Sequence, residues 1–281
     1  MNTGALEEEG GENSEVAFGV AERVSLTAFR NYRSLSLRLS SGFNVLSGEN
    51  AQGKTNFIEA LALASTTRLL RGQRDAEAIL DGEETARVEV ELGGSGTLIG
   101  IELRKGIRKR ATLNGMGLPR ASDLIGRMPS ICLTIGDMEI VRGEPSDRRM
   151  MLDLELSSLY PSYLRHLTAY KRALEQRNAL LRHDETLPPD EYFEPWEQQL
   201  AEHGTPLRHM RLAYIDQLTP VAERVHSDMG RGEAISLHYS PKDDSQAPED
   251  LLRALQASRR QDVHRGGTGV GPHRDDLLIS I

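Results

Sequence analysis

The chain has 281 residues, 38% hydrophobic and 27% charged, an ordinary globular balance that excludes a mainly disordered chain. No run of about 18 apolar residues occurs, so the sequence predicts no membrane span, and no signal-peptide pattern is visible. The single cysteine, Cys132, excludes a disulfide framework and a multi-cysteine metal site. These features together favour the cytoplasm.

The formal net charge of −8 excludes a strongly basic nucleic-acid binder on bulk charge. The acidic residues are unevenly distributed, because residues 1–22 contain six glutamates and no lysine or arginine. The rest of the chain is therefore close to neutral, and a local basic patch could still contact phosphates. The Glu- and Gly-rich composition of residues 1–22 predicts a disordered acidic tail.

After this tail, short alternating segments predict strands. We expect strands at 24–29, 34–39 and 43–47, a helix from Lys54 to about Leu70, and further strands over 86–113. The dipeptide Asn114-Gly115 is typical of a hairpin turn. The apolar, β-branched run 129–135 predicts a buried strand that holds Cys132 as inert core.

The second half of the sequence is mainly helical. Pro145 stands where proline favours a helix start, and helical periodicity then runs from 161 to about 230, divided into two long helices by Pro188-Pro189. Trp196 is expected in the core of this helical region. A short helix at 250–260 and a final strand at 275–281, without an expected pairing partner, complete the pattern.

This order of elements predicts an α/β fold in which a helical lobe is inserted into a nucleotide-binding head. The expected division is a tail at 1–22, a head lobe at 23–160, a helical lobe at 161–261 and a returning head strand at 262–281.

Residues 48–55, Gly-Glu-Asn-Ala-Gln-Gly-Lys-Thr, match the phosphate-loop (Walker A) pattern G-x-x-x-x-G-K-[ST]. In this pattern the glycines let backbone N–H groups surround the phosphates, the lysine reaches the β- and γ-phosphates, and the Thr55 hydroxyl ligates Mg²⁺. The loop follows a predicted strand and opens a predicted helix, as the motif requires. The pattern therefore predicts nucleotide binding, but kinases, GTPases and several ATPase classes share it.

The predicted ATP-binding residues are those of the loop: Gly48, Glu49, Asn50, Ala51, Gln52, Gly53, Lys54, Thr55 and Asn56. Two further candidates, Arg30 and Asn31, lie on the turn between the first two predicted strands. These side chains could reach the phosphates or could belong to an ordinary polar turn, and spacing alone favours neither reading.

Four stretches resemble known proteins. Residues 29–61, FRNYRSLSLRLSSGFNVLSGENAQGKTNFIEAL, resemble the start of the ABC-type chromosome and repair ATPases, which include the SMC and Rad-fifty group, the OLD nucleases and the RecF family. Residues 134–153 and GPHRDDL at 271–277 resemble signatures of the RecF family in particular, and 170–182 resembles its long helix. The resemblance covers residues 23–281 and implies an ABC-type P-loop ATPase head that binds ATP and Mg²⁺.

The signature in 134–153 is an acid, an apolar pair, and then Gly-x-Pro-x-x-Arg-Arg-x-Phe-Leu-Asp. It is matched by Asp137, Ile140, Val141, Gly143, Pro145, Arg148, Arg149, Leu152 and Asp153, while Gly136, Glu144 and Met151 depart from it. The i,i+4 spacing of Arg149 and Asp153 favours an ion pair within one helix over anchoring of the head to the lobe. The resemblance places His273, Arg274 and Asp275 near the nucleotide side of the head, as weak site candidates.

The resemblance also implies a function. RecF proteins bind DNA at single-strand gaps and duplex junctions in recombinational repair and replication restart, act with RecO and RecR to load RecA, form ATP-dependent homodimers, and belong to the SOS response. Basic residues that could contact DNA phosphates form two clusters: Arg68, Arg71 and Arg74, and Arg104, Lys105, Arg108, Lys109 and Arg110. The alternative for both clusters is ordinary solvated charge, since Glu83, Glu84, Glu89 and Glu91 are near in sequence.

In the family, GPHRDDL leads to an LSxGQ-like signature helix and a Walker B strand that ends in paired acids. Neither motif is found in these 281 residues, so we expect the chain to be a C-terminally truncated fragment rather than a divergent short protein. The alternatives to a RecF-like function are a non-catalytic nucleotide-binding remnant and another SMC- or OLD-type ATPase.

Walker B acids orient the attacking water in phosphoryl transfer. We therefore expect this chain to hold ATP phosphates weakly without hydrolysing ATP or dimerising on it. Steady-state phosphate release checks this expectation, with Lys54→Ala as the matched control. Turnover that is lost in the Lys54→Ala variant would contradict it.

Overall fold

The computed structural model describes residues 19–70, 74–182, 189–230 and 233–281. The described residues form two compact units, which divide between Ser130 and Ile131 and are named here the first and second unit. The expected tail lies mostly outside the described residues, but its last two residues, Ala21 and Glu22, already belong to a strand. The compact units divide at 130/131, whereas the division into head and lobe expected from the sequence lies at 160/161.

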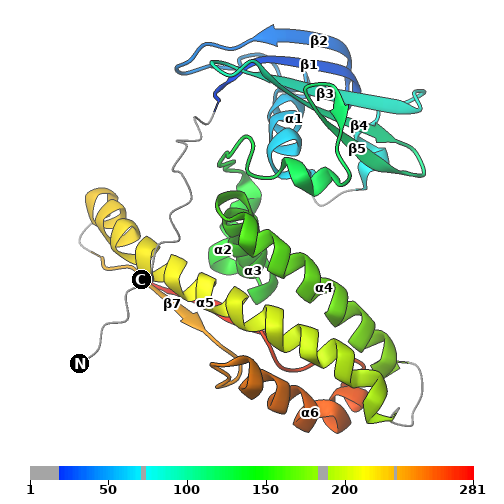
Figure 1. The fold of residues 1–281 in the computed structure, drawn as a ribbon. Coiled ribbons are helices and arrows are strands. Elements are labelled where there is room, and N and C mark those ends of the chain that lie inside the picture. The colour runs from blue at the N-terminus through cyan, green and yellow to red at the C-terminus, as the bar shows by residue number, and fades with distance from the viewer. Residues whose placement is uncertain (1–18, 71–73, 183–188, 231–232) are drawn as a thin grey trace. The chain divides into compact units, whose positions relative to one another are not determined.

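The first unit is an antiparallel sheet with a helix on one face (Figure 1). Its strands follow the order β2-β1-β3-β4-β5-β6. The elements are β1 Ala21–Phe29, β2 Tyr32–Arg38, α1 Lys54–Thr66, the short 3₁₀ turn η1 Asp75–Ala78, β3 Thr85–Leu92, β4 Thr97–Arg104, β5 Ile107–Leu113, β6 Met116–Gly117 and the 3₁₀ turn η2 Ala121–Leu124. The predicted hairpin turn at Asn114-Gly115 is confirmed, because both residues have positive φ between β5 and β6.

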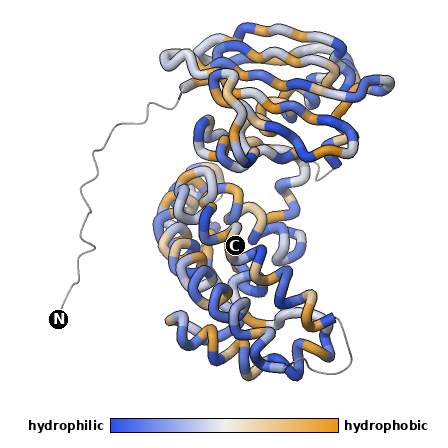
Figure 2. Tube along the Cα trace, turned by 45° about the vertical axis from the view of Figure 1, so that its right-hand side comes forward, coloured by the Kyte–Doolittle hydropathy of each residue, from blue (hydrophilic) through white to orange (hydrophobic). Residues whose placement is uncertain are grey.

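Alternation along the strands builds the core of this unit. In β3, Ala86, Val88, Val90 and Leu92 are buried, while the residues between them face the other side. Helix α1 packs Phe57, Ala60 and Leu63 against the buried side of the sheet. Figure 2 shows the resulting change between hydrophobic and hydrophilic residues along each strand. Burial of apolar area at about 25 cal/mol per Å² drives this packing.

Two predicted strands are wrong. Residues 43–47 form no strand, and Phe43 and Val45 are 103% and 87% exposed. Residues 129–135 also form no strand, with Ile131 and Leu133 at 79% and 85%, and Cys132 is only partly buried. A strand needs a neighbour to take up its backbone hydrogen bonds. No described strand pairs with either segment, so the strand-like sequence there produces no sheet.

The second unit is mainly helical. Its elements are η3 Ile135–Met138, α2 Glu139–Arg142, α3 Pro145–Leu159, α4 Pro161–Arg182, α5 Asp190–Met229, β7 Ser236–Ser240, α6 Pro248–Arg265 and β8 Asp276–Ser280. As predicted, Pro145 opens a helix and Pro189 directly precedes α5, whereas Pro188 lies outside the described residues. Trp196 packs on the core between α4, α5 and α6, as expected. Helix α6 is longer than predicted, and β8 pairs with β7, a strand that the sequence analysis missed.

Charged side chains are buried where α4, α5 and α6 meet. Arg177 is fully buried and donates to Glu197 Oε1 (3.1 Å), Asp262 Oδ2 (2.8 Å) and the Leu255 carbonyl (2.9 Å). Arg259 makes a second ion pair with Glu197 (2.6 Å). The Phe193 ring lies 5.8 Å and 5.3 Å from the Arg177 and Arg259 guanidinium carbons. This cluster links all three helices through the charge of Arg177.

Replacing Arg177 with methionine should strongly destabilise the second unit, because Glu197 and Asp262 would lose a buried counter-charge. Loss of one partner of a buried ion pair costs about 3–5 kcal/mol of unfolding free energy. Chemical denaturation followed by circular dichroism measures the change. The control is Arg253→Ala in the exposed i,i+3 pair with Asp250, which is expected to have a much smaller effect because solvent screens that pair. Equal effects of the two substitutions would contradict the importance of the cluster.

Candidate nucleotide-binding site

The phosphate loop joins the segment after β2 to α1, and its backbone explains the glycines of the motif. Gly48 has φ +146° and Gly53, the residue before α1, has φ +104°. These left-handed values favour glycine. A Cβ atom on Gly53 would also lie 2.7 Å from Asn31 Oδ1 and 2.9 Å from Tyr32 Cζ. Ala51 is the one non-glycine residue of the loop with positive φ, at +66°. The loop therefore has the tight backbone that a phosphate cradle needs.

Lys54 lies against its own loop. Its Nζ donates to the backbone carbonyls of Gly48 (2.7 Å) and Glu49 (2.6 Å). Thr55 is exposed at the start of α1, and no acidic side chain lies in the first helical turn. The positive end of the helix dipole is therefore not neutralised locally, which suits an anion.

The turn between β1 and β2 contacts this loop. Asn31 Oδ1 accepts from Asn56 Nδ2 (2.9 Å) and lies directly against Gly53. Arg30 instead forms a bidentate pair with the buried Glu59 of α1 (2.8 and 2.9 Å) and donates to the Glu77 carbonyl (2.9 Å). Asn31 thus belongs to the geometry of the loop. Arg30 joins the turn to α1 and η1, and its contact with phosphate stays a prediction.

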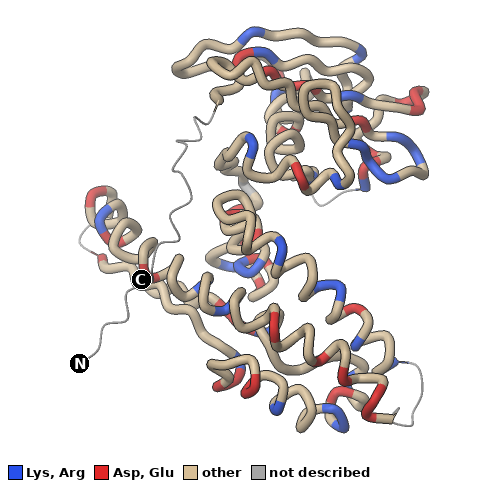
Figure 3. Tube along the Cα trace, viewed as in Figure 1, with Lys and Arg blue, Asp and Glu red and all other residues tan. Residues whose placement is uncertain are grey.

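The predicted DNA-contacting residues have different surroundings. Lys109 is held by Asp75 Oδ1 (2.8 Å) and the Thr67 carbonyl (2.9 Å), and Lys105 pairs with Glu84 (3.5 Å). Arg110 stands opposite Glu102 in the β4–β5 register. The remaining candidates are exposed: Arg68, Arg74, Arg104 and Arg108. Arg71 lies outside the described residues. Figure 3 shows basic residues gathered at the β4–β5 hairpin, named here the basic patch, with acidic residues close by. The positive charge of the basic patch is therefore partly neutralised.

The signature residues of the second unit contact the last strand and the long helices. Arg148 makes a bidentate pair with Asp276 (2.8 and 3.0 Å) and donates to the Gly143 carbonyl (2.9 Å). Arg149 donates to the backbone carbonyl of Asp275 (2.8 Å). Pro145 is the first residue of α3. Through these arginines, α3 holds the start of β8.

The expected ion pair between Arg149 and Asp153 within α3 is wrong. Asp153 is buried and accepts from Tyr163 Oη (2.7 Å), Arg211 Nη2 (2.8 Å) and Lys171 Nζ (2.9 Å), all on α4 and α5. The buried face of α3 brings Asp153 to its neighbouring helices, where a buried carboxylate needs several donors. Although burial opposes its charge, Arg211 and Lys171 hold the pKa of Asp153 below its usual value.

Asp275 is the centre of a second buried group. It is fully buried and accepts from Arg208 Nε (2.7 Å), Tyr239 Oη (2.7 Å) and the Lys242 backbone N–H (2.9 Å). Arg208 also forms a bidentate pair with Asp243 (3.0 and 2.9 Å). Sequence reasoning missed Arg208 and Arg211. The signal was their position on the same helical stripe as Leu207 and Ile215, both buried.

His273 has a structural environment. Its Nε2 donates to the Thr268 carbonyl (2.9 Å), so its Nδ1 accepts from Tyr170 Oη (2.6 Å). Arg274 donates to the same Thr268 carbonyl (2.9 Å). Burial, together with the charges of Arg274 and Arg149, lowers the pKa of His273 to about 4. His273 is therefore neutral at pH 7, and both ring nitrogens are used within the second unit. Across the described residues, no three His, Cys, Asp or Glu side chains gather as a metal site.

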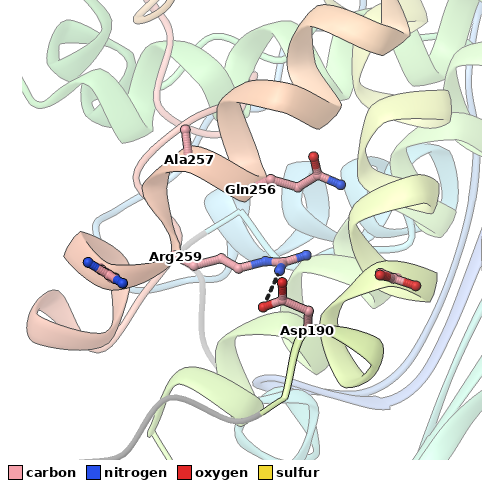
Figure 4. Close-up of a pocket in the computed structure, with 6 residues that line it drawn as sticks. Asp190, Gln256, Ala257 and Arg259 are labelled. Atoms are coloured by element: carbon pink, nitrogen blue, oxygen red, sulfur yellow. Dashed lines mark ion pairs between the residues drawn. The ribbon is translucent and has the colours of Figure 1, made fainter.

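A pocket of about 410 Å³ lies between the start of α5 and the second half of α6 (Figure 4). It is lined by Asp190, Glu194, Gln256, Ala257, Arg259 and Arg260. The ion pair between Arg259 and Asp190 (2.6 Å) crosses it. Its charged groups thus compensate one another, and the phosphate loop remains the better candidate for ligand binding. No helix in the described ranges is long and apolar enough to cross a membrane.

The loop, its helix and the covering sheet define a P-loop ATPase of the ABC type. A family described as an AAA domain matches residues 23–142. Two relatives named DNA replication and repair protein RecF are similar over most of the chain. The protein from Agathobacter rectalis is 35% identical over 93% of this chain and 73% of its own length, and that from Gloeobacter violaceus is 37% identical over 92% and 72%.

Among solved structures, the recombination mediator protein RecF in its ATP form is 26% identical, with a TM-score of 0.85 over 93% of this chain and 74% of that protein. The chain belongs to the RecF family of DNA replication and repair proteins.

The pKa of His273 makes the stability of the second unit depend on pH. The unfolded chain binds a proton near pH 6.5, whereas the folded chain does so only near pH 4. Stability from this group is therefore complete above pH 6.5 and is lost as pH falls toward 4, by about 3 kcal/mol in total.

The measurement is the free energy of unfolding at several pH values between 4 and 6.5. The slope should flatten in a His273→Asn variant and persist in His264→Asn, which removes an exposed histidine of α6. An unchanged slope in His273→Asn would overturn the assignment.

Proposed function

We propose that this chain binds ATP with Mg²⁺ at residues 48–56 and binds DNA in a manner that depends on ATP. The observation that carries this proposal is the phosphate loop. Its two glycines have left-handed φ values, Lys54 lies over it, and it opens a helix without acidic residues in its first turn. The ATP form of the similar RecF structure supports the choice of nucleotide.

The residues present fit this cofactor. Lys54 would exchange the Gly48 and Glu49 carbonyls for phosphate oxygens, and the exposed Thr55 hydroxyl is available to Mg²⁺. Backbone N–H groups at the start of α1 would hold phosphate without needing a side chain. When bound, Mg²⁺ neutralises phosphate charge. Asn31 supports Gly53 and Asn56 from the neighbouring turn and so keeps the loop in shape.

The DNA-binding part of the proposal is supported by family membership and by the exposed arginines of the first unit. The solved relatives are described as recombination mediators in the RecFOR pathway. We accordingly propose single-strand gaps and duplex junctions as the DNA target, and RecO and RecR as partners in loading RecA. We also propose action on DNA in the cytoplasm during the SOS response. Because acids surround the basic patch, its attraction for phosphates is local and depends on salt.

One experiment tests both parts. Fluorescence anisotropy of a gapped duplex is measured with and without Mg²⁺ and ATP, and ATP binding is measured separately by calorimetry. Lys54→Ala should weaken ATP binding at least tenfold, since charge-assisted hydrogen bonds contribute about 1.5–3 kcal/mol, and should remove the ATP-dependent part of DNA binding. Serine at Arg104, Arg108 and Arg110 together should weaken DNA binding and reduce its salt dependence while leaving ATP binding unchanged.

The matched control is Arg87→Ser. Arg87 is an exposed arginine of the same sheet that already pairs with Glu89 (3.1 Å). It should change neither ligand's affinity. ATP binding that survives Lys54→Ala would refute the site, and DNA binding that the triple substitution leaves intact would refute the patch.

A further inference from the structure

Two histidines face one another between α4 and α5. His166 on α4 and His203 on α5 have their Nδ1 atoms 3.2 Å apart, with ring centroids at 5.3 Å and planes inclined by 55°. Both side chains are half-buried. Over the described part of the chain, this shared contact is the only hydrogen bond of either ring, and each Nε2 has no protein partner. The pair is separate from the phosphate loop, which belongs to the other unit.

The spacing suits two ligands of one metal ion. Zinc binds imidazole nitrogen at about 2.0–2.1 Å, and two nitrogens of a tetrahedral ion are then about 3.4 Å apart. The observed Nδ1 separation of 3.2 Å is close to that value, so an ion could enter with little movement of either helix. Imidazole suits zinc and copper, whereas Mg²⁺ prefers oxygen ligands.

We propose that His166 and His203 form a binding site for a divalent transition-metal ion, Cu²⁺ or Zn²⁺, which joins α4 to α5. Water completes the coordination sphere. The protons balance without an added base. In the neutral pair, the Nδ1–H of one ring donates a hydrogen bond to the bare Nδ1 of the other ring. On metal binding, the donor ring changes tautomer and carries its proton on its own Nε2. Both Nδ1 atoms are then free to ligate.

Charged residues of opposite sign flank the pair. Arg165 neighbours His166 on α4, and Glu202 neighbours His203 on α5. The Glu202 carboxylate offsets the repulsion between Arg165 and a bound cation.

The test uses the full chain without nucleotide. Thermal unfolding is followed with one to ten equivalents of Cu²⁺ or Zn²⁺, and with Mg²⁺ as the negative control. The expected result is a rise in Tm with Cu²⁺ and Zn²⁺ but not with Mg²⁺, with Cu²⁺ bound more tightly than Zn²⁺. His166→Gln and His203→Gln should each weaken Cu²⁺ binding at least tenfold, whereas His264→Gln, which removes an exposed histidine on α6, should not.

A second measurement needs no variant. Electron paramagnetic resonance of the Cu²⁺-loaded wild-type chain should show coupling to two imidazole nitrogens. A spectrum with oxygen ligands only, or a Tm rise that both glutamine variants retain, overturns the proposal. The two histidines would then have only a structural role, as a hydrogen bond that joins α4 to α5.

Discussion

Burial of arginine side chains determines how the second unit is assembled. Arg177, Arg208 and Arg211 are 0–3% exposed. A guanidinium taken out of water is costly unless its donors and its charge are satisfied. Each arginine meets this requirement with partners from elements distant in sequence: Arg177 with Asp262, Arg208 with Asp275, and Arg211 with Asp153. The helices and β8 can satisfy these groups only in one mutual arrangement, so the charges select that arrangement, while apolar contacts supply most of the free energy.

The first unit follows a different rule. Its sheet and α1 share an apolar core in which all the largest buried side chains are hydrocarbon or aromatic. The buried ionic contact is the pair between Arg30 and Glu59, placed where the β1–β2 turn meets α1. This pair fixes the turn that carries Asn31, and Asn31 in turn lies against Gly53 of the phosphate loop. The loop is thus supported by the polar contact with Asn31 and by helix α1, which packs on the hydrophobic core.

The sequence was informative where structure depends on local patterns. The antiparallel strands, the start of α1 at Lys54 and the helix start at Pro145 follow from alternation, the phosphate-loop motif and proline geometry. The partners of Arg148 and Asp153 could not be predicted, because spacing within one helix carries no information on residues 128 or 58 positions away. Local patterns failed at 43–47 and 129–135. The alternation at 43–47 and the apolar, β-branched run at 129–135 are both typical of strands, but pairing depends on neighbours that a local pattern does not specify.

The contact of Lys54 with its own loop affects how a ligand would be received. The ammonium group already holds the Gly48 and Glu49 carbonyls, so the loop has its curved shape before anything binds. An incoming phosphate would replace the two carbonyls as the acceptor of the hydrogen bonds from Lys54. Its binding would not require ordering of a flexible loop. The entropy cost of immobilising the loop is therefore met during folding, and binding selectivity rests on whether an anion is a better acceptor than two peptide carbonyls. A triphosphate satisfies this condition through its charge, whereas an uncharged nucleoside does not.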